Sequence, residues 1–459
     1  MPASQRNLES QPGKKFMTSH GRSARALQTP TAGRLALPLM LCLSVPLACH
    51  SPGGAAEPQP AISVQAQTLQ LSECLHLALD RQPRIAAQRA SLAAAEDGKR
   101  ALDALRFPAT IDHEIPIRRK QAALGVDAAA AGLDEAERET VYAVTRTWFT
   151  VLYAREQERI ARGVVERIRT THDAARRALD SGARDVTTND VDRSAVYLRL
   201  AEVKRTQASQ GVKRALAALR EAVGGGPDIS LDVPGDRLPV PEVRPGREEV
   251  VRAALARRGD VIQAGIFAQV ACLEVEAQGT SIHQRMQTFA AGSDIHARQV
   301  PQGVHDTEYR PGAVPPEMPT LLAGSRPERI KHAQSLSARA EATVEVTRNL
   351  IALEAEDAFL RWEEAEQQAR QAREAADTGD RLADGLSKDY AAGQKVKVED
   401  VINAQVLASQ ARSQYAESLY RLILALANLE RITAGGFCAG LSEPAQRRTS
   451  QAAGDAKAK

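Results

Sequence analysis

Histidines and cysteines are the side chains of this sequence that could bind a metal or act as nucleophiles. Four histidines lie in or beside one proline-rich stretch: His283, His296, His305 and His332. Their separations fit none of the spacings that zinc sites use, so we interpret them as ordinary surface histidines and predict no metal site. The cysteines occur singly, without a CxxC pair, at Cys42, Cys49, Cys74, Cys272 and Cys438. This pattern predicts no disulfide framework.

Sequence patterns that support catalysis are missing from the chain. GxGxxG, Walker-type, GxSxG and HExxH sequences do not occur, so phosphate cradles, nucleophile elbows and paired metal histidines have no candidate. Carboxylates are dense on one expected helix, at Glu354, Glu356, Asp357, Glu363, Glu364 and Glu366. Such residues are typical of a solvated face paired with arginines. We therefore predict no catalytic residue, no cofactor and no enzymatic activity.

The composition favours long helices. Among 459 residues, 43% are hydrophobic but only 3% are aromatic, and alanine and charged residues recur throughout, which suits helices better than large sheets. Sixty basic and 57 acidic residues are interspersed, for a net charge of +3. Because no concentrated basic surface is expected, the composition argues against binding to nucleic acids.

The first 49 residues have the pattern of an export signal. Arg34 precedes the apolar run LALPLMLCLSVPLAC, residues 35–49, which is followed by a Gly/Pro-rich stretch. The run is shorter than the roughly 20 apolar residues of a membrane-spanning helix. Cys49 follows Leu47 and Ala48 as in a bacterial lipobox, and we retain both a lipidated and an unlipidated Cys49. Met17 is an alternative start. Residues 50–68 then form an expected linker.

An internal repeat organises the rest of the chain. ECLHLALDRQPRIAAQRA resembles EVVRAALARRGDVIQAGI at a constant offset of 176 residues, which pairs Leu79 with Leu255 and Ile85 with Val261. We therefore predict a first repeat over residues 69–226, a linker over 227–246, a second repeat over 247–436 and a disordered tail over 437–459. The fragments Glu114–Pro116 and Glu317–Pro319 also look alike, so we expect equivalent positions for them.

Each repeat contains a very long helical pattern. No proline occurs between Leu133 and Val223, and apolar residues recur three or four positions apart, the spacing of a coiled-coil stripe. A break near Gly182 would give two helices of about 45 residues, each roughly 65 Å long. Gly182 and Gly393 are each followed by an acidic residue and a valine that open another periodic helix, which predicts two equivalent turns.

These features together resemble the TolC-like outer-membrane efflux family over nearly all of the chain after the leader. The matching segments are LSECLHLALDRQPRI, ETVYAVTRTWFTVLYAREQERIARGVVE, RALDSGARDVTTNDV and KDYAAGQKVKVEDV. The resemblance implies a mainly α fold in which duplicated, long coiled-coil helical hairpins form a trimeric α-barrel below an outer-membrane β-barrel. It also implies a homotrimer that works with a periplasmic adaptor (membrane fusion) protein and an inner-membrane pump.

The resemblance assigns roles to residues near the two glycines. Gly182 and Gly393 resemble the turns at the periplasmic tip that contact the adaptor. Asp190 and Asp400 resemble acidic residues near the closed end of the tunnel, while Asn403 stands where a family member has a further aspartate. Tyr390 and Lys395 resemble a tyrosine and a basic residue of the family that form gating bonds at this closed end.

The sequence departs from the family where the β-barrel strands should lie. A transmembrane strand needs about 9 to 11 residues, and residues 107–120 cannot hold two of them. The corresponding stretch of the second repeat is rich in proline, which is poor material for a barrel wall. We therefore expect a reduced or absent β-barrel portion, with attachment through lipid on Cys49 or through a partner.

Two functions remain open at this point. The resemblance implies a passive export conduit located in the outer membrane and extending into the periplasm, as one component of a tripartite efflux or secretion system. The alternative is a periplasmic coiled-coil structural or adaptor protein that forms no pore. The alternative shares the export signal and the heptads, but it does not require paired turns or threefold assembly.

Overall fold

The computed structural model describes residues 67–105, 113–182, 186–281, 284–289 and 318–441. Every described helix and strand belongs to one unit, which lies within residues 62–459. The predicted leader and Cys49 lie outside the described residues, as do His283, His296 and His305. The stretches that bear on a reduced β-barrel, 106–112 and 290–317, also lie outside them.

Two sets of four helices with identical lengths follow one another along the chain. In each set, helices of 11, 22, 66 and 35 residues occur in that order. The first set is α1 (Leu71–Arg81), α2 (Pro83–Ala104), α3 (Ile115–Asp180) and α4 (Thr188–Ala222). The second set is α5 (Arg247–Arg257), α6 (Gly259–Thr280), α7 (Arg326–Ala391) and α8 (Val398–Ile432). The prediction of a mainly α, duplicated fold of long helical hairpins is confirmed.

Prolines set the start of the longest helices. Pro116 is the second residue of α3 and Pro327 the second residue of α7, where a missing N–H costs no helical hydrogen bond. The predicted equivalence of Glu114–Pro116 with Glu317–Pro319 is therefore wrong, since Pro319 precedes the strand before α7. The expected pair of helices of equal length is also wrong, because α3 begins well before Leu133 and is almost twice as long as α4.

Two short strand pairs connect the helices. Strand β1 (Gln67–Thr68) pairs in parallel with β2 (Leu231–Asp232), and β3 (Arg285–Gln287) pairs antiparallel with β4 (Leu321–Ala323). The segment 227–246, predicted as a linker, contributes Leu231, Val233 and Leu238 to the core. It is thus packed against the helices along part of its length.

The start of the predicted tail is ordered. Ala434 and Gly435 both have positive φ and turn the chain back after α8. Ala439 is then buried, and its N–H donates to the carboxylate of Glu430. Because these contacts hold the chain as far as residue 441, the tail predicted from residue 437 begins too early.

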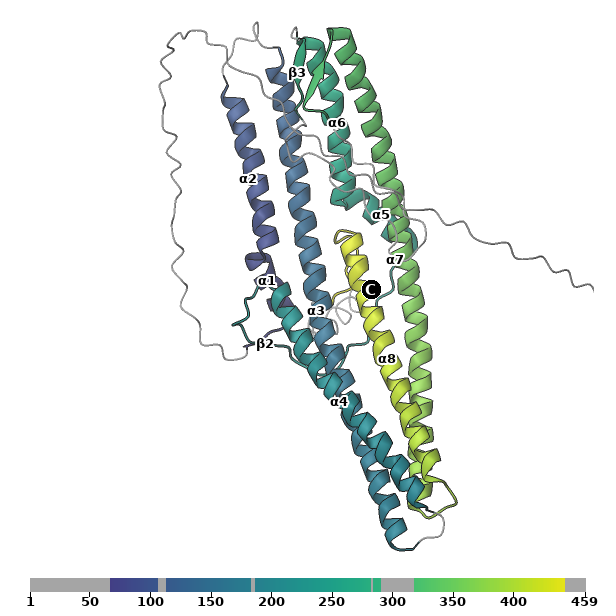
Figure 1. Cartoon of the computed structure of the whole chain (residues 1–459). Helices are drawn as coiled ribbons and strands as arrows, with labels where there is room; N and C mark the ends of the chain where they lie inside the picture. The colour runs from purple at the N-terminus through teal and green to yellow at the C-terminus, as the bar shows by residue number, and fades with distance from the viewer. Residues whose placement is uncertain (1–66, 106–112, 183–185, 282–283, 290–317, 442–459) are drawn as a thin grey trace, which may run out of the picture. The chain divides into compact units, whose positions relative to one another are not determined.

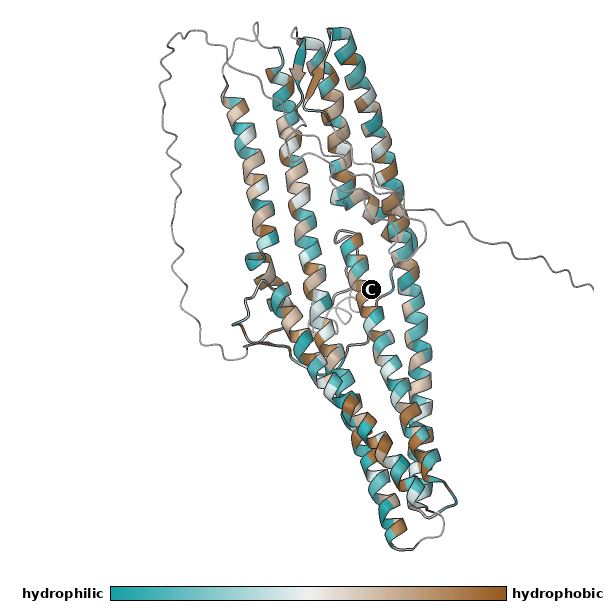
Figure 2. Ribbon diagram, viewed as in Figure 1, coloured by the Kyte–Doolittle hydropathy of each residue, from teal (hydrophilic) through white to brown (hydrophobic). Residues whose placement is uncertain are grey.

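Small side chains let the long helices approach one another closely. Helix α3 pairs with α4, α7 pairs with α8, and α3 also lies along α8, so both hairpins join in one unit (Figure 1). A Cβ atom placed on Gly379 of α7 would lie 3.1 Å from the Cα atom of Ala408 on α8. Hydrophilic and hydrophobic residues mix along the helices (Figure 2). Among the described residues, no helix has the length and apolar character needed to cross a membrane.

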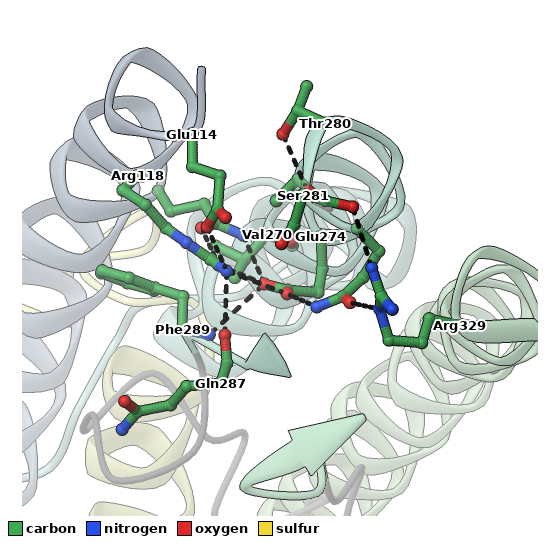
Figure 3. A network of polar contacts seen from close by, with 12 residues as sticks. Glu114, Arg118, Val270, Glu274, Thr280, Ser281, Gln287, Phe289 and Arg329 are labelled. Atoms are coloured by element: carbon green, nitrogen blue, oxygen red, sulfur yellow. Dashed lines mark hydrogen bonds and ion pairs between the residues drawn. The ribbon is translucent and has the colours of Figure 1, made fainter. Parts of the chain in front are cut away.

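A buried polar network fastens the β3–β4 pair to the helices (Figure 3). Glu274 of α6 is 1% exposed, and its carboxylate accepts hydrogen bonds from Arg118 of α3 at 2.5 and 3.2 Å. Arg118 also donates to the carbonyl of Gln287 at 2.9 Å. Arg329 of α7, also buried, donates to the carbonyls of Ser281 and Gly324, both at 2.9 Å. These two arginines thus hold both strands to three helices.

Replacing the carboxylate at the centre of this network should destabilise the fold strongly. In Glu274→Leu, Arg118 would lose its buried counter-ion and keep only the longer ion pair with Glu114, at 3.5 Å, so we expect a loss of about 3 kcal/mol of unfolding free energy. Urea unfolding followed by circular dichroism measures this loss. The control is Glu276→Leu on the exposed face of the same helix, which we expect to change stability by no more than about 0.5 kcal/mol. Equal losses in both variants would contradict a structural role for the network.

Candidate functional site at the two interhelical turns

Both long hairpins turn at glycines in the left-handed conformation. Gly182 has a φ of +78° and Gly393 a φ of +73°, which side-chain-bearing residues adopt only with strain. Each lies at the C-terminal end of a 66-residue helix, and its N–H donates to a carbonyl three residues earlier. The two turns lie at the same end of the unit, the lower end in Figure 1. They are the turns predicted from the sequence.

The two aspartates predicted near the turns have different surroundings. The Asp190 carboxylate accepts hydrogen bonds from the hydroxyl of Thr187 at 2.7 Å and from its N–H at 2.9 Å, which completes a capping box at the start of α4. These bonds lower the pKa of Asp190 below its ordinary value. Asp400 is exposed in the first turn of α8, where the N-cap residue Lys397 makes no side-chain cap.

Tyr390 of the second hairpin lies close to Asp190 of the first. Tyr390 is partly buried against an apolar cluster that contains Ala175, Val398 and Ile402. Burial, and then the nearby negative charge of Asp190, raise the pKa of the Tyr390 phenol. The structure therefore brings together two of the residues that the sequence singled out, and they come from different repeats.

The other predicted residues take less part in this contact. Lys395 and Asn403 are exposed. The lysine whose charge acts on Asp190 is Lys397, two positions further along. Lys397 is the last residue before α8, and it directly precedes Val398, which belongs to the apolar cluster.

Two polar contacts near the turns were not predicted from the sequence. Arg193 of α4 forms an ion pair with Glu399 of α8, which is a second link between the hairpins. Deeper in the unit, the buried Gln405 of α8 donates to the hydroxyls of Thr171 on α3 at 3.1 Å and Ser387 on α7 at 3.3 Å. In the sequence, Arg193 follows Asp190 by three residues and Glu399 directly precedes Asp400. The opposite charges of Arg193 and Glu399 were the sequence feature from which this ion pair could have been predicted.

The described side chains near the turns offer charged groups and hydrogen bonds. Within the described residues, no three His, Cys, Asp or Glu side chains are grouped so that they could hold a metal ion. Most of the carboxylates considered above as a possible catalytic set are engaged in ion pairs with arginines, as Glu354 is with Arg258 and Arg431, Glu356 with Arg247, Asp357 with Arg361, and Glu366 with Arg244. They are structural charges.

The fold is shared with known membrane channels. No family model and no curated protein matches this chain. Among solved structures, the open state of the MtrE outer membrane channel of Neisseria gonorrhoeae matches with a TM-score of 0.61 at 14% identity, over 80% of this chain and 89% of that one. This chain has an outer-membrane-channel fold.

Further solved structures give the same result. The outer membrane protein VceC of Vibrio cholerae matches with a TM-score of 0.61 at 14% identity, over 80% of this chain and 97% of that one. The CmeC outer membrane channel of Campylobacter jejuni matches with a TM-score of 0.59 at 12% identity, over 83% and 88%. The predicted resemblance to TolC-like proteins is confirmed for the fold.

The contact between the hairpins can be tested through the tyrosine. In Asp190→Asn the negative charge beside Tyr390 is removed, so its phenolate becomes less unfavourable and we expect the pKa of Tyr390 to fall. Titration of carbon-13-labelled tyrosine by NMR follows this pKa directly. The control is Asp192→Asn, which changes an exposed carboxylate two residues away. A Tyr390 pKa that stays constant in Asp190→Asn would show that Asp190 does not lie close to Tyr390.

Proposed function

We propose that this chain is the outer-membrane channel component of a tripartite export system and acts as a passive conduit. The observation that carries the proposal is the shared fold with outer-membrane channels along most of both chains. In this proposal the protein lies in the outer membrane and extends into the periplasm, where an adaptor contacts the turns at Gly182 and Gly393. An inner-membrane pump supplies the energy, so the chain itself needs no catalytic group.

The contacts between the two hairpins at the turns form the gate in this proposal. Tyr390 packs on an apolar cluster that includes Ala175 of the first hairpin, and Arg193 forms an ion pair with Glu399, so both link the hairpins. Opening requires that both contacts break, and their exposed charged partners keep the cost of this step modest. Asp400 and Asn403, which are exposed on α8, then line the constriction together with Asp190. Lys397 takes the role first assigned to Lys395.

Exposed apolar stripes support the assembly of a homotrimer. Val346, Leu353 and Leu360 recur every seven residues on α7 and are exposed. On α4, Val196, Leu200 and Val203 form a second exposed stripe. Heptad spacing of unpaired apolar residues is the pattern of a helix that packs against another helix. Two different stripes on one chain allow a head-to-tail contact that closes into a ring.

Weakening the contacts at the gate should open the channel. In the variant Arg193→Ala, loss of the exposed ion pair with Glu399 should raise the open fraction by about two- to fivefold. Single-channel recording of the full-length protein in planar bilayers measures this fraction. The control is Arg421→Ala, which removes an ion pair with Glu417 elsewhere on α8. A wild-type protein that never conducts would overturn the conduit and support the periplasmic rod.

A charge placed on an apolar stripe should prevent assembly. Leu200 and Val240 are both 58% exposed, but only Leu200 lies on a stripe. We expect Leu200→Glu to weaken trimer association by about tenfold or more, because a buried leucine contact is replaced by a charge. Val240→Glu should leave assembly unchanged. Analytical ultracentrifugation of the full-length protein in detergent distinguishes trimer from monomer, and a monomeric wild type would contradict the proposed assembly.

A further inference from the structure

A pocket lies where the connection between the two repeats crosses the second hairpin. Residues 241–244, here named the strap, run over α7 and α8 and enclose a space of about 370 Å³. The strap is held on this side by an ion pair between Arg244 and Glu366 of α7, at 3.2 Å. The volume lies within the range of small-molecule sites in proteins, roughly 300–1,000 Å³. The pocket is distant in sequence from the turns and has no part in the gate.

The floor of the pocket is apolar and aromatic. Leu422 and Leu426 of α8 and Trp362 of α7 line it, and all three belong to the buried core. Trp362 is 6% exposed, and its indole N–H is buried without a hydrogen-bond partner among the described residues. The indole of Trp148, by contrast, donates to the carbonyl of Leu69. A cation cannot accept a hydrogen bond from this N–H, so the part of Trp362 that a cationic ligand would use is its aromatic ring.

The rim of the pocket carries two carboxylates, one of which is paired with arginines. Glu242 and Glu366 both line it, together with one basic residue, Arg244. Glu366 is shared between Arg244 and Arg370, at 3.2 and 3.3 Å. The Glu242 carboxylate is exposed and remains available to a ligand. An aromatic ring next to a free carboxylate favours a cation, through cation–π attraction and through charge pairing.

We propose that this pocket binds a small organic cation with an aromatic or branched apolar body. The body packs on Leu422, Leu426 and the Trp362 ring, and the cationic group pairs with Glu242. A bound cation would thereby connect the strap to both helices of the second hairpin. This inference is independent of the proposed conduit function, since it rests on the pocket alone.

Trp362 itself reports on binding. The chain has two tryptophans, so in a full-length Trp148→Phe background the emission comes from Trp362. The probe is phenethylammonium, and 3-phenylpropionate, an anion of similar size and shape, is the reference. We expect a saturable change in Trp362 emission with phenethylammonium and none with 3-phenylpropionate. A response that does not saturate, or that is equal for both ions, overturns the proposal.

Two variants test the assigned contacts. Glu242→Gln removes the exposed carboxylate and should weaken phenethylammonium binding by about threefold, whereas Glu248→Gln, an exposed residue that does not line the pocket, should leave it unchanged. Leu422→Phe should fill the floor and abolish the response in a protein that keeps its helical circular dichroism spectrum. Unchanged affinity in Glu242→Gln would refute the site even if Leu422→Phe failed to fold.

Discussion

The structure depends on covering the apolar stripes of its two longest helices. A helix of 66 residues extends about 100 Å and exposes its apolar stripe along the whole length unless other helices pack on it. Near the turns, the 35-residue helix that follows in sequence covers the stripe. Further away, the 22- and 11-residue helices cover the remainder, and the three covering helices together match the length of the long helix.

This constraint explains why the two repeats keep the same lengths although their sequences have diverged. A change in the length of one covering helix would leave part of α3 or α7 without its partner from the same repeat. The long helices also share partners across the repeats, since α3 packs on both α8 and α6. The turns of both hairpins are consequently held at one end of the unit, and this brings Tyr390 near Asp190.

Much of this architecture could be predicted from the sequence because it depends on the repeat spacing and on residues that determine the backbone conformation. The repeat offset of 176 residues describes the first two helices of each set, and Gly182 and Gly393 mark the turns because only glycine adopts a positive φ without strain. The length of α3 was missed because the helical pattern was followed only from Leu133, whereas α3 begins at Ile115 and carries Pro116 in its first turn, where a proline is compatible with a helix.

Side-chain partners near the turns were harder to predict. The second turn is one residue shorter than the first. Charged residues at the same distance from Gly182 and from Gly393 therefore do not occupy equivalent positions. Lys395 was assigned from the family resemblance, whereas the lysine whose charge acts on Asp190 is Lys397, two positions further along. The contact of Arg193 with Glu399 joins different hairpins and depends on how α4 lies beside α8, which periodicity within one helix does not encode.

The two turns also differ in how firmly their following helices begin. Thr187 and Asp190 close a capping box at the start of α4, while α8 starts at Lys397 without a side-chain cap. Caps of this kind contribute about 1 kcal/mol to the stability of a helix start. The first turn of α8 is therefore the easier of the two to distort, and it carries Glu399 and follows Tyr390 closely. A gate built on contacts between the hairpins would open first by movement on the side of the second repeat.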